Sequence, residues 1–548
     1  MSIEEEVAKR RTFAIISHPD AGKTTLTEKL LLYGGAIQTA GQVSARRAQR
    51  AATSDWMELE KQRGISITST VLQFPYGGYT INLLDTPGHQ DFGEDTYRTL
   101  LAADSAVMLI DAAKGVEPQT KKLFAICRAR RIPLFTFINK MDRPSRDPLE
   151  LLDELESVLG IGAFPMNWPL GNGPSFKGVY DRQTREVHLF ERSAHGAKRA
   201  HVEMAGINDP QIRELLDEQS LSEFRDGLEL LEGAGADFDH EAMLRGEVTP
   251  VFFGSAVTNF GVQLFLDRFV AMSPPPAARV SNAGAVDPAS DQFSGFVFKI
   301  QANMDPRHRD RVAFVRVCSG KFERDMTVRN ARTGKDVRLS RAMRLFASER
   351  ESLEAAYAGD VVGLANPGVF AIGDTLFEPP SSGSASLRFE RVPSFAPEHF
   401  ASVRSIDTSA YKSFGKGIAQ LREEGAIQVM YPIGSMRTEP VLAAVGALQF
   451  EVVKYRLESE YNVKTVMSGL PFSLARRVQG EPDLILRAQL PTNAKLVEDW
   501  DGRPVALFES EWSLRLAEEW NPKLRFVEFT AIDRGSNEEV FGAGARSA

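Results

Sequence analysis

The run Phe13-Ala-Ile-Ile-Ser-His-Pro-Asp-Ala-Gly-Lys-Thr24 decides the fold of the first part of this chain. Four apolar residues are followed at once by small and polar ones, which is typical of a buried strand that ends in a tight loop. From Ser17 onward the run nearly matches G-x-x-x-x-G-K-[ST], a loop between strand and helix whose backbone N–H groups surround phosphate oxygens. Ser17 stands where the pattern has glycine, so the match fails at one position. The sequence still predicts a phosphate-binding loop.

Further apolar runs extend this pattern over residues 1–278. The runs Ile81–Leu84, Ala106–Ile110 and Pro133–Ile138 read as buried strands separated by segments of helix length. Such alternation predicts a mostly parallel sheet with helices on both faces. Residues of about 160–250 are less regular and read as an insertion, after which Val251–Phe253 returns to the same sheet.

The rest of the chain changes character twice. After the break at Ser273-Pro-Pro-Pro276, residues 290–382 show many short alternating strands, which predict an antiparallel β-barrel. Residues 388–548 mix strand and helix patterns and predict an α+β C-terminal domain. The predicted fold class is therefore multidomain: a P-loop α/β domain, a β-barrel domain and an α+β domain.

Composition sets the bounds of this interpretation. The chain has 548 residues, 43% of them hydrophobic and 25% charged, which fits a globular protein of about three or four domains. Its net charge of −8 argues against DNA as a partner, and no run of about 18 apolar residues predicts a membrane span. The two cysteines, Cys127 and Cys318, are expected to be buried, reduced thiols of a cytosolic protein.

The phosphate loop carries specific expectations. Lys23 would reach the β- and γ-phosphates, and the Thr24 hydroxyl would bind Mg²⁺. The predicted nucleotide-binding residues of this loop are Ser17, His18, Pro19, Asp20, Ala21, Gly22, Lys23, Thr24 and Thr25.

The segment Asp85-Thr-Pro-Gly-His89 follows the next apolar strand. A carboxylate at Asp85 can hold Mg²⁺ through water, and the Gly88 N–H can be donated to the γ-phosphate. The predicted nucleotide-binding residues here are Asp85, Thr86, Pro87, Gly88 and His89.

Two later segments point to the base. In Asn139-Lys-Met-Asp142, the Asp142 carboxylate can accept hydrogen bonds from N1–H and the exocyclic amine of guanine, a pair that adenine lacks. Asn139 and Lys140 would brace the loop and the base. In Gly254-Ser-Ala256, Ser255 and Ala256 would place N–H groups near the guanine O6. The order and strand context of the four motifs predict a GTP/GDP site.

With these motifs the chain resembles the ribosomal translation GTPases. Arg63-Gly-Ile-Ser66 is similar to their first switch, whose hydroxyl binds Mg²⁺; either Ser66 or Thr68 can match that hydroxyl. The resemblance implies that His89 is the catalytic histidine that positions the attacking water. It also implies that the preceding basic cluster, Arg46-Arg47 with Arg50, meets ribosomal RNA.

Within that family the chain most resembles the bacterial release factor 3 proteins, which are similar to elongation factor G over the first domains. The segments that show this resemblance are Ser17–Leu30, Ser54–Glu60, Gln73–Tyr76, Gln420–Gln428 and Gly446–Val453. The resemblance implies a cytoplasmic, monomeric, ribosome-stimulated GTPase of translation termination. It further implies GTP, GDP and Mg²⁺ as ligands and, as partners, the ribosome and the class I release factors that the protein would eject.

Other functions stay open at this stage. An elongation or ribosome-protection factor is disfavoured because only residues 388–548 follow the predicted barrel. A kinase or metabolic P-loop enzyme would lack the guanine motif at Asn139–Asp142. A binding protein with a degenerate nucleotide site is suggested only by Ser17, against the retained Lys23, Thr24, Asp85 and His89.

Overall fold

The computed structural model describes most of the chain. The described residues are 2–37, 68–190, 202–206, 210–233, 237–302, 311–346, 349–379, 386–390, 392–393, 395–434 and 439–529. The predicted switch serine Ser66 and the basic cluster at Arg46, Arg47 and Arg50 lie outside them.

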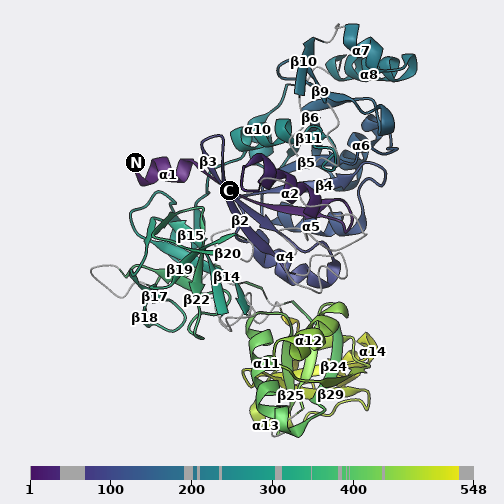
Figure 1. The fold of residues 1–548 in the computed structure, drawn as a ribbon. Coiled ribbons are helices and arrows are strands. Elements are labelled where there is room, and N and C mark those ends of the chain that lie inside the picture. The colour runs from purple at the N-terminus through teal and green to yellow at the C-terminus, as the bar shows by residue number, and fades with distance from the viewer. Residues whose placement is uncertain are drawn as a thin grey trace.

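A mixed, mostly parallel sheet forms the centre of the first domain (Figure 1). All of its neighbouring strands run parallel except the hairpin of β2 and β3. In spatial order the strands are β2 Thr70–Tyr76, β3 Tyr79–Asp85, β1 Arg10–Ser17, β4 Ser105–Asp111, β5 Leu134–Asn139, β11 Val248–Phe253 and β6 Gly162–Pro165. The predicted α/β fold of this domain is confirmed.

Both faces of this sheet are covered because successive side chains of a strand point to opposite sides. Phe13 and Ile15 of β1 enter one core with Leu30 of α2 and Phe269 of α10. Their neighbours Ala14 and Ile16 enter the other core, together with residues of α4 and α5. The continuous apolar run at the start of the chain is therefore explained by burial on both sides.

The helices of this domain follow or precede the strands in the sequence, and several of them cover the faces of the sheet. They are α1 Ile3–Ala8, α2 Lys23–Tyr33, α4 Gly93–Leu100, α5 Pro118–Ala129, α6 Pro148–Glu154, α9 His240–Leu244 and α10 Val262–Met272. A short antiparallel sheet with two helices lies between β6 and β11 in the sequence. Its elements are β7 Asn167–Leu170, β8 Gly178–Asp181, β9 Glu186–Phe190, β10 Val202–Gly206, α7 Pro210–Leu215 and α8 Glu218–Gly233.

The second domain is a curled antiparallel sheet around its own apolar core. Its main strands follow the order β18-β17-β23-β14-β15-β22-β19, preceded in the chain by the hairpin β12 Arg279–Ser281 and β13 Gly284–Val286. The strands are β14 Ser294–Ala302, β15 Arg311–Ser319, β16 Lys321–Glu323, β17 Thr327–Asn330, β18 Asp336–Arg338, β19 Ala342–Phe346, β20 Glu349–Ser352, β21 Ala355–Tyr357, β22 Val361–Ala365 and β23 Thr375–Phe377.

The C-terminal domain is one antiparallel sheet with helices packed on it (Figure 1). Apolar residues of α11 and α12 share a core with β24, β25 and β26. The helices are α11 Tyr411–Glu423, α12 Leu448–Ser459, α13 Pro482–Leu486 and α14 Glu511–Trp520. The strands in spatial order are β27 Thr465–Leu470, β24 His399–Ser405, β26 Val441–Ala444, β25 Gln428–Pro432, β29 Ala494–Asp499, β30 Pro504–Phe508, β28 Leu474–Gln479 and β31 Arg525–Val527.

The first two domains are joined by more than their linker. Strand β19 pairs with β2, so one hydrogen-bonded sheet runs through both domains. Beside this junction the buried Asp360 carboxylate accepts hydrogen bonds from Arg10 Nε at 2.7 Å and from Gln73 Nε2 at 3.0 Å. The two domains therefore share backbone pairing and a buried ion pair.

Two predictions, one about the cysteines and one about membrane-spanning helices, can be compared directly with the structure. Cys127 and Cys318 are both buried and unpaired thiols, and burial raises the pKa of Cys127 to about 12. In the described part of the chain, no helix combines the length and the apolar character that crossing a membrane requires.

Candidate functional site

The loop between β1 and α2 has the backbone that a phosphate-binding loop needs. Asp20 and Gly22 have φ angles of 66° and 100°, which aim successive N–H groups inward. A Cβ at Gly22 would lie 2.4 Å from Asn139 Nδ2, so only glycine fits there. Gly22 is also the N-cap of α2 and has no side chain to cap it, and the first N–H groups of a helix have no partner within the helix.

The charged groups of the first two motifs are in direct contact. Lys23 Nζ lies 2.6 Å from Asp85 Oδ1, and both side chains are buried. Thr24, the next residue of α2, is partly exposed. The Ser17 hydroxyl is buried and has no hydrogen-bond partner among the described residues. The loop thus holds an unsatisfied buried polar group at its first residue, which fits a site that takes up a phosphate.

The second motif packs against the first loop. The Thr86 hydroxyl donates to the Ile15 carbonyl at 2.6 Å and so ties the end of β3 to β1. A Cβ at Gly88 would lie 3.6 Å from Pro19 Cα, which places this segment directly beside the phosphate loop. His89 follows at the surface of the site, with its side chain 30% exposed.

His89 is held by the residue two positions later. Its Nδ1 lies 3.3 Å from the Asp91 amide nitrogen and 3.2 Å from Asp91 Oδ1. A neutral ring can accept the N–H, and a protonated ring can donate to the carboxylate. In either state Asp91 engages Nδ1, which leaves Nε2 as the nitrogen for another partner.

The third and fourth motifs are joined to the phosphate loop by Asn139. Its Nδ2 donates to the Ala21 carbonyl at 2.8 Å, and its Oδ1 accepts from the Ala256 amide at 2.9 Å. Lys140 Nζ reaches the Asp20 carbonyl at 2.5 Å and Asp111 Oδ2 at 2.7 Å. One asparagine and one lysine thus fix the distance between the two halves of the site.

Asp142 is oriented from the fourth motif. The Ser255 hydroxyl donates to Asp142 Oδ1 at 2.6 Å, and Ser255 is fully buried. The Asp142 side chain, which also carries the second carboxylate oxygen Oδ2, is partly exposed. The predicted site residues from Ser17 to Ala256 therefore gather at the carboxyl ends of β1, β3, β5 and β11, while Ser66 is not described.

Comparison with known families identifies the three domains. Residues 8–275 match the elongation factor Tu GTP binding domain, residues 292–378 match elongation factor G domain 2, and residues 389–518 match the C-terminal domain of class II release factor RF3. A crystal structure of a Thermus thermophilus protein has a TM-score of 0.67 at 24% identity, over 87% of this chain and 71% of that one. That structure supports the fold alone.

Full-length relatives decide the family. A Cyanothece protein named peptide chain release factor 3 is 60% identical over 98% of both chains. The chain belongs to the peptide chain release factor 3 family. The relative of that name from Gloeobacter violaceus is 58% identical, over 97% of this chain and 99% of its own. As a member of this family with a GTP-binding domain, the chain is a translational GTPase.

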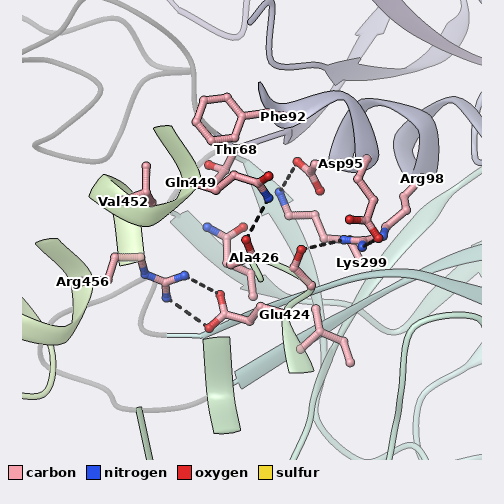
Figure 2. A pocket seen from close by; sticks show the side chains of 14 residues that line it. Thr68, Phe92, Asp95, Arg98, Lys299, Glu424, Ala426, Gln449, Val452 and Arg456 are labelled. Atoms are coloured by element: carbon pink, nitrogen blue, oxygen red, sulfur yellow. Dashed lines mark hydrogen bonds and ion pairs between the residues drawn. The ribbon is translucent and has the colours of Figure 1, made fainter. Parts of the chain in front are cut away.

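This family member has a pocket where its three domains meet (Figure 2). The cavity measures about 60 Å³ and is lined by Thr68 and Phe92 of the first domain and Lys299 of the second. Glu424 and Arg456 of the C-terminal domain form a bidentate pair on its wall, with N–O distances of 3.0 and 3.1 Å. Burial raises the pKa of Glu424. The pocket borders the residues just after the predicted first switch and just after the Asp85–His89 segment.

Sequence reasoning did not single out Asp111, Asp91 and Lys299. Asp111 ends β4, which lies between the strands that carry the other motifs. A carboxylate at the carboxyl end of such a strand could have been predicted from the sequence to lie at the site. Asp91 and Lys299 act across domain boundaries. Leu448 N donates to Asp91 Oδ2 at 2.8 Å, and Lys299 Nζ donates to the Ser69 carbonyl. No local pattern in the sequence marks either contact.

Proposed function

We propose that this chain is a ribosome-dependent GTPase of translation termination that promotes dissociation of class I release factors from the ribosome after peptide release. The observation that carries the proposal is the pairing of a GTP-binding domain with a C-terminal domain of the release factor 3 type in one chain. The full-length relatives bear the name of a release factor, which supports the termination role over an elongation role.

The nucleotide would lie along the carboxyl ends of the sheet. The phosphates would rest on residues Ser17–Thr25, with Lys23 leaving Asp85 to reach the β- and γ-phosphates. Gly88, which packs close to Pro19, would donate its N–H to the γ-phosphate. The ion pair of Lys23 and Asp85, which brings both charged groups together at the end of the phosphate loop, supports this placement.

The guanine base would be read by Asp142. Because the Ser255 hydroxyl already donates a hydrogen bond to Asp142 Oδ1, the carboxylate is oriented before the base binds. Lys140 and Asn139 would hold the loop against the phosphate side of the site, and the Ala256 N–H, which is donated to Asn139 Oδ1, would brace Asn139 instead of being available to O6. A site prepared in this way discriminates guanine from adenine by unpaired polar groups.

A magnesium ion fits the oxygen ligands at this end of the sheet. Thr24 and Asp85 offer a hydroxyl and a carboxylate of the kind that Mg²⁺ prefers, and Ser66 or Thr68 would add the switch hydroxyl. When bound, the ion would neutralise the charge that develops on the β- and γ-phosphate oxygens.

Catalysis would rest on His89. Its Nδ1 is engaged by Asp91, so Nε2 is the nitrogen that would hold the attacking water in line with the γ-phosphate. Hydrolysis of this type depends on positioning and electrostatic stabilisation. The ribosome would complete the arrangement of His89, which would account for ribosome-stimulated hydrolysis.

GTP can drive release-factor ejection only if it binds one arrangement of the domains better than another. Contacts of the first domain with the other two lie just after the predicted first switch, at Ser69, and just after the Asp85–His89 segment, at Asp91. A change at the γ-phosphate would therefore alter domain positions. This role implies action as a monomer in the cytoplasm, in contact with ribosomal RNA, ribosomal proteins and the class I factor.

The test is GTP hydrolysis by the purified protein, alone and with 70S ribosomes, together with departure of a labelled class I factor from terminated ribosomes. His89→Ala is compared with His399→Ala, a matched change at an exposed histidine at the start of β24. We expect strong ribosome stimulation and faster departure in the parent and in His399→Ala, and loss of both in His89→Ala.

Two outcomes would contradict the proposal in different ways. Stimulated hydrolysis without faster departure of the class I factor would keep the GTPase and exclude the termination role. Equal stimulation of the parent and His89→Ala would exclude the proposed role of His89.

A further inference from the structure

The turn that carries His89 is attached to the C-terminal domain by a polar contact. The Asp91 carboxylate places Oδ2 2.8 Å from the amide nitrogen of Leu448, the first residue of α12. The same carboxylate places Oδ1 3.2 Å from His89 Nδ1. One side chain thus touches both the predicted catalytic histidine and a helix of another domain.

Asp91 acts as a cap that α12 lacks within its own sequence. The N-cap residue of α12 is Ala447, which offers no side-chain acceptor. The first N–H groups of a helix need acceptors, and its N-terminus favours a negative charge. The carboxylate of Asp91, 357 residues away in the sequence, supplies both.

The loop before α12 is shaped for this contact. A Cβ at Gly446 would lie 2.2 Å from Asp91 Cγ, so glycine is required for the close approach. Gln449 Oε1 accepts from the amides of Val445 and Gly446 at 2.9 and 3.1 Å, and Gln449 Nε2 donates to the Ala426 carbonyl at 2.9 Å. These three hydrogen bonds therefore hold the loop in place within the C-terminal domain.

An apolar contact lies next to the polar one. Phe92 packs with Val452 of α12, and Leu448 and Tyr455 of the same helix adjoin them. Figure 2 shows Phe92 and Val452 beside Gln449 at the junction pocket. The two residues that attach the turn to α12, Asp91 and Phe92, are thus neighbours in the sequence and follow His89 closely.

We infer that Asp91 is a positioning residue through which the position of the C-terminal domain sets the orientation of His89. When α12 moves relative to the first domain, the Leu448 amide moves the Asp91 carboxylate, and the carboxylate turns the ring that it holds at Nδ1. The inference rests on the proposed role of His89. It adds that the C-terminal domain controls hydrolysis through one carboxylate.

The experiment disturbs the contact without touching the nucleotide site. Gly446→Ala places a methyl group against Asp91, whereas Gly415→Ala in α11 places one in open space and serves as the matched control. The measurements are kcat of GTP hydrolysis at saturating ribosomes, the Kd for GDP and the thermal midpoint of unfolding. We expect Gly446→Ala to lower kcat roughly 10- to 100-fold relative to Gly415→Ala, with the Kd for GDP unchanged.

A double variant tests the linkage itself. Because Asp91→Ala removes the carboxylate that the new methyl group would displace, Asp91→Ala with Gly446→Ala should be no slower than Asp91→Ala alone. Multiplied effects would overturn the inference, as would a kcat of Gly446→Ala equal to or above that of Gly415→Ala. A kcat loss matched by an equal loss of GDP affinity would also overturn it, because a structural defect would then explain both.

His89→Ala in the same series separates this inference from the proposed function. If His89→Ala hydrolyses GTP slowly while Gly446→Ala does not, only the role of Asp91 is wrong. If His89→Ala is as fast as the parent, the role of His89 and the inference that depends on it are both wrong.

Discussion

Lys23 and Asp85 form a buried ion pair, 2.6 Å apart, that joins the phosphate loop to the end of β3. Each charge is costly to bury alone, so removing one partner leaves the other uncompensated. We expect Lys23→Met to lower the free energy of unfolding by about 3–5 kcal/mol, measured by urea denaturation. We also expect it to weaken GDP binding, because the same ammonium would bind the phosphates.

The two consequences of Lys23→Met are separated by a second change. In Lys23→Met with Asp85→Asn the buried carboxylate charge is gone, so much of the lost stability should return while GDP affinity stays low. If the double variant is less stable than Lys23→Met, the two side chains do not stabilise each other as an ion pair.

Ser255 offers a test of base recognition. Its hydroxyl donates to Asp142 Oδ1 at 2.6 Å from a fully buried position. Without this bond the carboxylate loses its fixed orientation, and a hydrogen bond to a charged group is worth about 1.5–3 kcal/mol. We expect Ser255→Ala to weaken GDP binding roughly tenfold or more, measured by titration with a fluorescent GDP analogue.

Inorganic pyrophosphate provides the comparison for Ser255→Ala, because it lacks the base. Its affinity should match that of the parent protein. An equal loss for GDP and pyrophosphate would mean that Ser255 supports the whole site and not the recognition of guanine.

The predicted elements of the first domain were readable because their signals are local. Phe13–Ile16 is buried on both faces, and the loop after it must be small and polar, so the sequence itself carries the pattern. The strand β2 was not recognised: it is an edge hairpin partner of β3, and Pro75 weakens its strand pattern. Its role in joining β19 of the second domain was therefore missed as well.

Contacts between domains could not be predicted in this way. Ala447 gives no sign that the cap of α12 comes from Asp91, because the acceptor lies in another domain. Glycine at 446 reads as a loop residue until the position of Asp91 is known. The motif residues that gather at the strand ends could be recognised in the sequence, whereas the residues that connect them to other domains required the structure.

Asp360 tests how firmly the second domain is attached to the first. Its buried carboxylate accepts hydrogen bonds from Arg10, Gln73 and the Tyr357 amide. We expect Asp360→Ala to destabilise the protein by about 3–5 kcal/mol, because Arg10 and the other donors lose a buried acceptor. Urea unfolding should show the lost stability, and limited proteolysis in urea should show earlier cleavage of the segment at residues 273–278, which joins the two domains.

Asp336→Ala is the matched control for Asp360→Ala, since Asp336 pairs with Arg329 at an exposed site of the same domain. It should leave both the unfolding curve and the cleavage pattern near those of the parent. Equal effects of the two substitutions would show that the Asp360 contact does not hold the domains together.

Asp95 predicts a pH dependence of stability at the junction of the first two domains. Burial alone would raise the pKa of Asp95, but the Lys299 ammonium and the hydrogen bonds from Ser69 lower it below its ordinary value of 3.8. The carboxylate therefore stabilises the fold fully above pH 3.8, and this contribution is lost as the pH falls below 3.8 through the folded-state pKa. Urea unfolding between pH 7 and pH 3 should show a smaller loss of stability in Asp95→Asn than in the parent, because the amide has no proton to take up.

Asp153→Asn, at an exposed position of α6, should follow the parent curve. Parallel curves for the parent and Asp95→Asn would show that the contact of Asp95 with Ser69 and Lys299 does not stabilise the charged carboxylate.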